Sequence, residues 1–215
     1  MNRTFKEIIA VAASLFLVFV AWYGSYSPMR KAEIYISTLQ GMQVTPVSSL
    51  NDLEKRLSAP LNYPSPIGQE ELVRNMTNSV LNFVQQSHDA ASIAELIRFT
   101  TGYFEPILAR GKGMSFSQDV YLMGAMNEVA YTKTGIKTYL DAAKKYYLTG
   151  ESIGPDRPQP LYGLFDVYRM EGDATNTEVI GNKILSNWPT DQNVRQGLEQ
   201  FLKQGTSSLM KATGK

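Results

Sequence analysis

Residues 8–23, IIAVAASLFLVFVAWY, form a continuous apolar run that only Ser14 interrupts. As a helix, these sixteen residues rise roughly 24 Å at about 1.5 Å each, slightly less than a hydrocarbon core of roughly 30 Å. Lys6 can make up the difference by snorkelling toward the head groups, and the aromatic pair Trp22 and Tyr23 suits a membrane–water interface. The run therefore predicts a helix that spans a membrane once.

Two other interpretations of this run fit less well. A cleaved signal peptide has a shorter apolar core and a small-residue cleavage site, whereas the bulky stretch WYGSYSPM ends this run. A helix of a soluble protein that packs on one side only would carry a polar face, and none interrupts the run. We therefore expect an N-terminal membrane anchor over residues 1–27.

The orientation of this anchor is less strongly specified. Arg3 and Lys6 before the run nearly balance Arg30 and Lys31 after it, so the positive-inside rule gives little bias. A lone N-terminal anchor followed by a long soluble domain usually leaves that domain outside. We therefore expect a single-pass protein of the cell membrane with an extracytoplasmic soluble domain.

Beyond Pro28 the apolar residues recur at the three- and four-residue spacing of amphipathic helices. The spacing predicts a first helix that stops near Gly41, a short helix around Leu53 and a longer helix from Gln69. Further helices are predicted over residues 117–134, 136–149, 157–171, 175–187 and 192–204. No stretch sustains the strict alternation of a strand, so the predicted fold is all-α, a membrane helix followed by an array of α-helical hairpins.

Helix boundaries follow from backbone chemistry. Proline lacks an N–H group, so Pro60 is expected to end the short helix. Pro106 is expected to kink or end the helix for which Asp89 is the predicted N-cap. The turn-rich segment LNYPSPIG then separates a helical stalk, residues 28–67, from a helical repeat domain, residues 68–215.

One repeat unit is recognisable near the C-terminus. Its expected packing residues share one helical face or mark a helix end: Leu161, Leu164, Phe165, Tyr168, Gly172 and Pro189. Counted from Pro158, they fall at positions 4, 7, 8, 11, 15 and 32 of a 34-residue unit, which resembles a tetratricopeptide repeat. Gly172 permits the left-handed cap that reverses the chain, and Pro189 cannot extend the second helix. Neither helix buries its face alone, so neighbouring repeats must stack on it.

The pattern is less regular upstream of this unit. Tyr131 and Gly135 echo its tyrosine and glycine, but 37 rather than 34 residues earlier. Asn127 and Glu128 occupy positions that a regular repeat fills with apolar residues. A generic array of α-hairpins is therefore the alternative to tetratricopeptide repeats.

A wider resemblance covers much of the chain. The apolar helix is followed by SPMRKAEIYISTLQ, NYPSPIGQEELVRNM, GPDRPQPLYGLFDVYRMEGD and ILSNWPTD. This order resembles the tetratricopeptide-repeat C-terminal tail of bacterial O-antigen ligase or polymerase-like membrane proteins, in which a P-x-G-x-x-E segment opens a helix. Pro66, Gly68 and Glu71 match that segment. The chain has no multi-pass body, so the resemblance implies a stand-alone accessory protein or a split-off tail, and no catalytic residue is carried over.

The composition offers little to catalysis. The chain has no cysteine, one histidine and a net charge of +1, which excludes thiolate chemistry and points away from nucleic acid. His88 beside Asp89 is interpreted as a surface residue at a helix boundary, because no second histidine is present. The glycine-rich loop at residues 111–113 lacks the spacing of a phosphate-binding loop.

The clustered charged residues are also explained by helix structure without a catalytic role. Glu70 and Glu71 are adjacent, so on a helix they diverge and complement its positive N-terminal end. Residues 144–147, Lys-Lys-Tyr-Tyr, are interpreted as a solvated helix face with a packed tyrosine stripe. With one histidine and no clustered aspartates, we predict no catalytic, cofactor-binding or metal-binding residue.

What remains is a surface. In the recognised unit, Gln159, Tyr162, Asp166 and Arg169 lie off the packing stripe, on the face that lines the concave side of a repeat array. Tyrosine and arginine are frequent anchors in protein recognition, so this face is the predicted partner-binding surface, with an ordinary solvated face as the alternative.

The expected function is a non-enzymatic, membrane-anchored interaction scaffold that binds another protein, linked through the resemblance to assembly of envelope polysaccharide. Its partner would be a multi-pass enzyme acting on envelope glycans. The alternative is an accessory subunit, or a split C-terminal part, of a glycan ligase or polymerase that is active only in complex with such an enzyme. No cofactor and no nucleic acid are expected.

Overall fold

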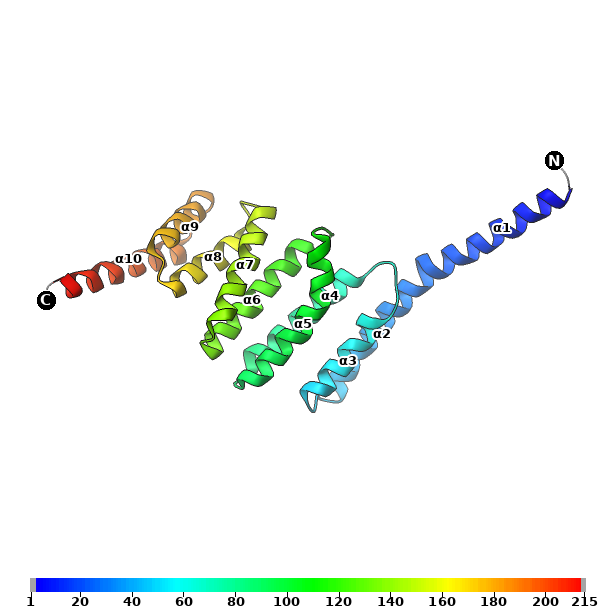
Figure 1. The fold of residues 1–215 in the computed structure, drawn as a ribbon, viewed down its shortest axis with the longest axis horizontal. Helices are drawn as coiled ribbons and strands as arrows, with labels where there is room; N and C mark the ends of the chain where they lie inside the picture. The colour runs from blue at the N-terminus through cyan, green and yellow to red at the C-terminus, as the bar shows by residue number, and fades with distance from the viewer. Residues whose placement is uncertain (1–2, 214–215) are drawn as a thin grey trace. The chain divides into compact units, whose positions relative to one another are not determined.

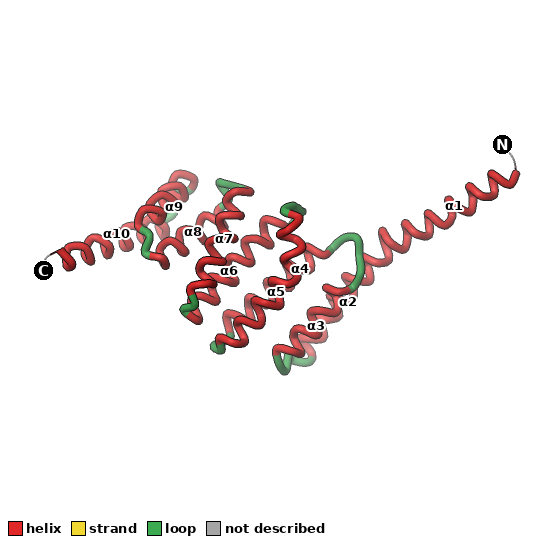
Figure 2. The backbone as a smooth tube through the Cα atoms, viewed as in Figure 1, coloured by secondary structure: helices red, strands yellow, loops and turns green. Residues whose placement is uncertain are grey.

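The computed structural model describes residues 3–213, and 85% of the chain is helical, with no strand in the described part. Figure 2 shows these helices joined by short loops. The prediction of an all-α fold is confirmed. The chain divides into two compact units: unit 1 extends to Ser79 and includes Arg98–Ser115, whereas unit 2 comprises Val80–Ile97 and the chain from Phe116 onward.

Unit 1 begins with one long helical segment. Helix α1 (Arg3–Ala21) continues through a π-helical turn, η1 (Trp22–Tyr26), into α2 (Ser27–Val44), as Figure 1 shows. The π turn ends two residues before Pro28, whose ring would clash with the carbonyl four residues earlier in a regular α-helix, and the wider turn relieves that clash. The helix therefore does not break where the apolar run ends.

The apolar side chains of α1 lie on its outside. Leu17 and Val18 are each 67% exposed, and none of the helix's described residues is buried. The segment Arg3–Val44 is long and apolar enough to cross a membrane, and it is the one such helical segment in the described residues. The predicted anchor therefore has the length and composition that a membrane span requires.

A second helix of unit 1, α3 (Leu50–Asn62), packs against α2. The Ser49 hydroxyl caps its first turn by accepting from the Asp52 backbone N–H at 3.2 Å. The expected end at Pro60 is wrong, because the helix continues to Asn62. Pro60 lies in the last turn, where it costs one hydrogen bond, and its burial beside Leu61 offsets that loss.

Two longer helices contribute to both units, α4 (Gln69–Gln86) and α5 (Ala90–Arg110). Asp89 caps α5 as predicted, since its Oδ2 accepts from the Ser92 backbone N–H at 2.8 Å. The expectation that Pro106 could end this helix is wrong, because α5 continues to Arg110. Phe104 and Ile107 are buried on either side of the proline, and their packing holds the last turn in helical form.

The segment between α3 and α4 is tied to the start of α2 within unit 1. The Ser27 hydroxyl donates to the Pro64 carbonyl at 2.6 Å. Buried Lys31 donates from Nζ to the Tyr63 carbonyl at 3.0 Å and also to the Gln69 side chain. These bonds fix the first residues after the apolar helix against the rest of unit 1.

Unit 2 contains five consecutive helices: α6 (Phe116–Thr134), α7 (Lys137–Ile153), α8 (Pro158–Glu171), α9 (Ala174–Asn187) and α10 (Gln192–Thr213). Each contacts the next one along the chain, and α6 also contacts α8 (Figure 1). The first four therefore form two helical hairpins, α6–α7 and α8–α9, whose first helices lie side by side.

The α8–α9 hairpin has the left-handed glycine and the following proline that its sequence predicts, and a cap at Asp173 that was not predicted. Gly172 adopts the left-handed conformation at φ 73° after α8, and the Asp173 side chain accepts from the Asn176 backbone N–H to cap α9. Pro189 lies just beyond α9. The expected packing residues of α8 are buried in a core shared with α7, α9 and α10, namely Leu161, Leu164, Phe165 and Tyr168.

Candidate functional site

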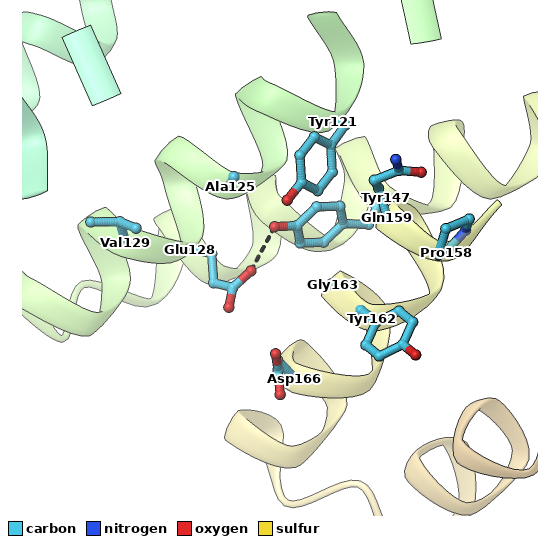
Figure 3. Close-up of a pocket in the computed structure, with 10 residues that line it drawn as sticks. All are labelled: Tyr121, Ala125, Glu128, Val129, Tyr147, Pro158, Gln159, Tyr162, Gly163 and Asp166. Atoms are coloured by element: carbon cyan, nitrogen blue, oxygen red, sulfur yellow. Dashed lines mark hydrogen bonds between the residues drawn. The ribbon is translucent and has the colours of Figure 1, made fainter. Parts of the chain in front are cut away.

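A pocket of about 560 Å³ opens on unit 2 between α6 and α8. Its floor and walls include Tyr121 and Glu128 of α6, Tyr147 of α7, and three α8 residues, Gln159, Tyr162 and Asp166 (Figure 3). We call this the α6–α8 pocket. It lies where the first helices of two successive hairpins meet.

Tyr147 forms the floor of the α6–α8 pocket and is 2% exposed. Its ring reaches from α7 between two glycines, Gly124 of α6 and Gly163 of α8. A Cβ atom at Gly163 would lie 2.4 Å from the tyrosine Cζ, and one at Gly124 would lie 2.5 Å from Cε1. The two glycines therefore make room for the ring, and any larger residue would displace it.

The Tyr147 hydroxyl donates a hydrogen bond of 2.6 Å to Oε2 of Glu128 (Figure 3). Burial raises the pKa of Glu128, and the charge of Asp166 raises it further, while the bond from Tyr147 lowers it. Burial, and next the negative charge of Glu128, raise the pKa of Tyr147, so its hydroxyl stays protonated and donates. The pocket thus holds a partly desolvated carboxyl group in a fixed position.

Asp166 lies across the pocket from Glu128, on α8. Burial raises its pKa, and the neighbouring Arg169 lowers it. The two acids face each other, and the second oxygen of Glu128 is directed toward Asp166 (Figure 3). The charge of Asp166 therefore disfavours ionisation of Glu128.

Tyr162 forms a wall and is held from outside the pocket. Its hydroxyl is hydrogen-bonded to Asp191, which, with burial, raises the pKa of Tyr162 to about 12. Its ring lies 6.0 Å from that of Trp188. These contacts hold the tyrosine ring in place.

The structure brings three of the four predicted face residues into one site, since Gln159, Tyr162 and Asp166 all line the α6–α8 pocket. Arg169 lies one turn further along α8, outside the lining. Its Nη1 is 3.2 Å from Oδ1 of Asp166, and its guanidinium lies over the Phe165 ring at 5.3 Å. Arg169 therefore lies at the rim of the pocket and does not line it.

Sequence reasoning missed the half of the pocket that α6 and α7 supply. Tyr121, Glu128 and Tyr147 were not among the expected face residues. A usable signal was present, because Glu128 occupies a position that a regular repeat makes apolar. Gly124 and Gly163 are a second signal, since glycine inside a helix often marks a close approach of another group.

The other sequence candidates lie apart from this pocket or serve the fold. His88 is exposed in the connection between α4 and α5. In unit 1, Glu70 is buried, pairs with Arg110 and accepts from the Ser115 backbone N–H at 3.2 Å. Lys144 belongs to the predicted solvated face, and its Nζ donates to Oε2 of Glu171 at 2.8 Å. This lysine therefore pairs with an acid of the same chain. The described residues contain no cluster of three or more potential metal ligands.

We expect Tyr147→Phe to raise the pKa of Glu128, because the substitution removes the hydrogen bond that lowers it. A ¹³C NMR titration of the glutamate carboxyl groups measures this directly. The groups that face Glu128 are Tyr121 from its own helix, Tyr147 from α7 and Asp166 from α8.

The raised pKa of Glu128 determines how the stability of the chain changes with pH. Stability contributed by Glu128 is complete below its unfolded pKa and is lost as the pH rises through its folded pKa. Tyr147→Phe should therefore match the parent most closely in acid and fall below it as Glu128 ionises. Tyr131→Phe, which removes a tyrosine hydroxyl elsewhere in unit 2, is the control. Equal losses at all pH values would contradict the role given to the hydrogen bond.

Comparison with protein-family models, with curated proteins and with solved structures found no match.

Proposed function

We propose that this chain is a non-enzymatic, single-pass membrane protein whose helical hairpins, of tetratricopeptide type, hold a partner protein through the α6–α8 pocket. The observation that carries the proposal is the composition of that pocket. It combines tyrosine rings, an amide and two carboxyl groups on the exposed side of two adjacent first helices. Such a mixture of aromatic and polar groups is typical of protein recognition sites.

The fixed geometry of the α6–α8 pocket supports specific binding of a partner protein. Tyr147 is locked between two glycines, and Tyr162 is held by Asp191. Side chains that are already ordered lose less conformational entropy when a partner binds. A pre-organised site of this kind favours one specific partner segment.

The membrane part of the proposal rests on α1 and on the contacts that follow it within unit 1. The exposed apolar surface of α1 has the composition of a membrane span. The bonds from Ser27 and Lys31 to the segment after α3 would seat unit 1 directly at the membrane exit. We place the soluble domain outside the cytoplasm, as the sequence suggests.

The resemblance to O-antigen ligase and polymerase-like tails stays a prediction. It would make the partner a multi-pass enzyme of envelope polysaccharide assembly, with this chain as its scaffold or accessory subunit. The proposal assigns no bond-forming step to this chain.

Site-specific photo-crosslinking in cells tests the proposal. With p-benzoylphenylalanine in place of exposed Gln159, we expect a discrete crosslink to another protein. With the same residue in place of Val179, which is 59% exposed on α9 and outside the pocket, we expect no such crosslink. The Tyr121→Ala, Tyr162→Ala double variant should lose the Gln159 crosslink.

Two results would overturn the proposal. One is a Gln159 crosslink that survives loss of both tyrosines, because the contact would then not involve the pocket. The other is the absence of any crosslinked protein at Gln159 while the chain is folded and located in the membrane.

A further inference from the structure

The α6–α8 pocket is asymmetric in charge. Among its described lining residues, the groups that can carry charge near neutral pH are two acids, Glu128 and Asp166, and none is basic. Arg169 lies at the rim, where its Nη1 is 3.2 Å from Oδ1 of Asp166. The pocket interior therefore presents negative charge to whatever enters it.

The two acids are incompletely compensated. Tyr147 engages Oε2 of Glu128, and the second oxygen is directed across the pocket toward Asp166 (Figure 3). Burial, and with it the negative charge of Asp166, raises the pKa of Glu128, which is the expected response of a carboxyl group that gains no positive partner. A cation placed between the two acids would relieve both effects.

The walls also suit a cation. Tyr121 and Tyr162 present rings to the pocket, and aromatic faces attract ammonium and guanidinium groups. Unit 2 already uses this contact twice: Lys144 Nζ lies 4.7 Å from the centre of the Tyr168 ring, and Arg169 lies over Phe165. The Arg169 pair further shows that Asp166 accepts a guanidinium in this setting.

Building on the proposed function, we propose that the partner inserts a lysine or arginine side chain into the α6–α8 pocket, between Glu128 and Asp166 and against the ring of Tyr121. The ammonium or guanidinium donates to the two carboxylates, and the methylene stem lies along the tyrosine. In this arrangement Arg169 is a competitor of the ligand for Asp166, not an anchor of the partner.

Short peptides test the chemistry without the partner. The probes are Ac-Ala-Xaa-Ala-NH₂ with lysine, arginine, norleucine or glutamate at Xaa, titrated into the 3-fluorotyrosine-labelled full chain in phosphatidylcholine nanodiscs. The ¹⁹F signal of Tyr121, assigned with Tyr121→Phe, is the readout. We expect saturable binding of the lysine and arginine peptides at least tenfold tighter than that of norleucine or glutamate.

Matched variants separate the pocket from overall charge. Glu128→Gln with Asp166→Asn should weaken the lysine peptide at least tenfold. Glu178→Gln with Glu199→Gln removes two exposed acids elsewhere in unit 2 and should leave binding within twofold. Circular dichroism shows whether each variant is folded. If the double variant is not folded, the single Asp166→Asn variant takes its place. Equal binding of norleucine and lysine, or equal losses in both double variants, would overturn the inference.

Arg169→Gln is a variant that should strengthen, not weaken, binding of the lysine peptide. Because it frees Asp166 from its own guanidinium, we expect the lysine peptide to bind two- to fivefold tighter, in line with the modest strength of an exposed ion pair. Weaker binding would make Arg169 part of the receptor and overturn its assignment as a competitor.

The crosslink at Gln159 distinguishes this inference from the proposed function on which it rests. In the Glu128→Gln, Asp166→Asn variant the crosslink should fall at least tenfold. An undiminished crosslink would overturn the cationic side chain while leaving a docking pocket. A pocket that selects the lysine peptide but yields no crosslinked protein would overturn the proposed function instead.

Discussion

Gly163→Val should destabilise the folded chain by about 3 kcal/mol, because the new side chain would occupy the space of the Tyr147 ring. The ring is almost completely buried and cannot swing into solvent without leaving its place between α6 and α8. For a chain of this size, that loss corresponds to a fall in Tm of roughly 6–12 °C. Thermal unfolding of the full chain in detergent, followed by circular dichroism at 222 nm, measures it.

A matched glycine provides the control. Gly102 also lies inside a helix, but a Cβ atom there would meet nothing within 4 Å. Gly102→Val should therefore be neutral or slightly stabilising, since valine is a better helix former than glycine by a few tenths of a kcal/mol. An equal loss at the two glycines would mean that helix propensity, not the tyrosine, sets the cost.

The double variant identifies the ring as the cause. Tyr147→Ala alone should cost about 3–5 kcal/mol, as is usual for truncation of a buried aromatic residue. Because it also vacates the space that the introduced valine needs, Gly163→Val should cost much less in that background. Additive losses would contradict the contact. The single Gly163→Val variant should also lose binding of the lysine peptide, because Tyr147 places Glu128.

The fold was predictable where local chemistry decides. The α8–α9 hairpin depends on a left-handed glycine at Gly172, a cap at Asp173 and a proline beyond α9, and all three act within a few residues. The predicted helix over 157–171 differs from α8 by one residue for this reason. Pro60 and Pro106 misled because burial of their neighbours outweighs the lost hydrogen bond, and burial is a property of the folded chain.

The site was predictable only in part, for the same reason. The face of α8 follows from helical spacing, so Gln159, Tyr162 and Asp166 could be grouped from the sequence. The contribution of α7 depends on Tyr147 passing between glycines of two other helices, which no local pattern specifies. The sequence did offer one indication of the α6 side of the pocket, because Glu128 stands at a position that a regular repeat makes apolar.

Leu15→Asp combined with Leu17→Asp should release the chain from the membrane. Both residues lie near the middle of α1 and are highly exposed there, at 66% and 67%. An aspartate at the centre of a membrane helix costs about 2.5–3.5 kcal/mol, so the pair costs roughly 6 kcal/mol, or about four orders of magnitude in partitioning. Carbonate extraction followed by centrifugation should move the chain from the pellet to the supernatant.

The control for this prediction is an aspartate placed at the end of α1 instead of near its middle. Thr4→Asp places the same charge in the first turn of α1, at the level of the head groups, and should leave the chain in the pellet. If the Leu15, Leu17 variant also stays in the pellet, α1 is not the anchor and the chain is retained by a partner. If it is released, loss of the Gln159 crosslink in the same cells would show that the partner meets this chain only at the membrane. Partner binding would then depend on α1 through location alone, because the α6–α8 pocket lies entirely in unit 2, whereas α1 belongs to unit 1.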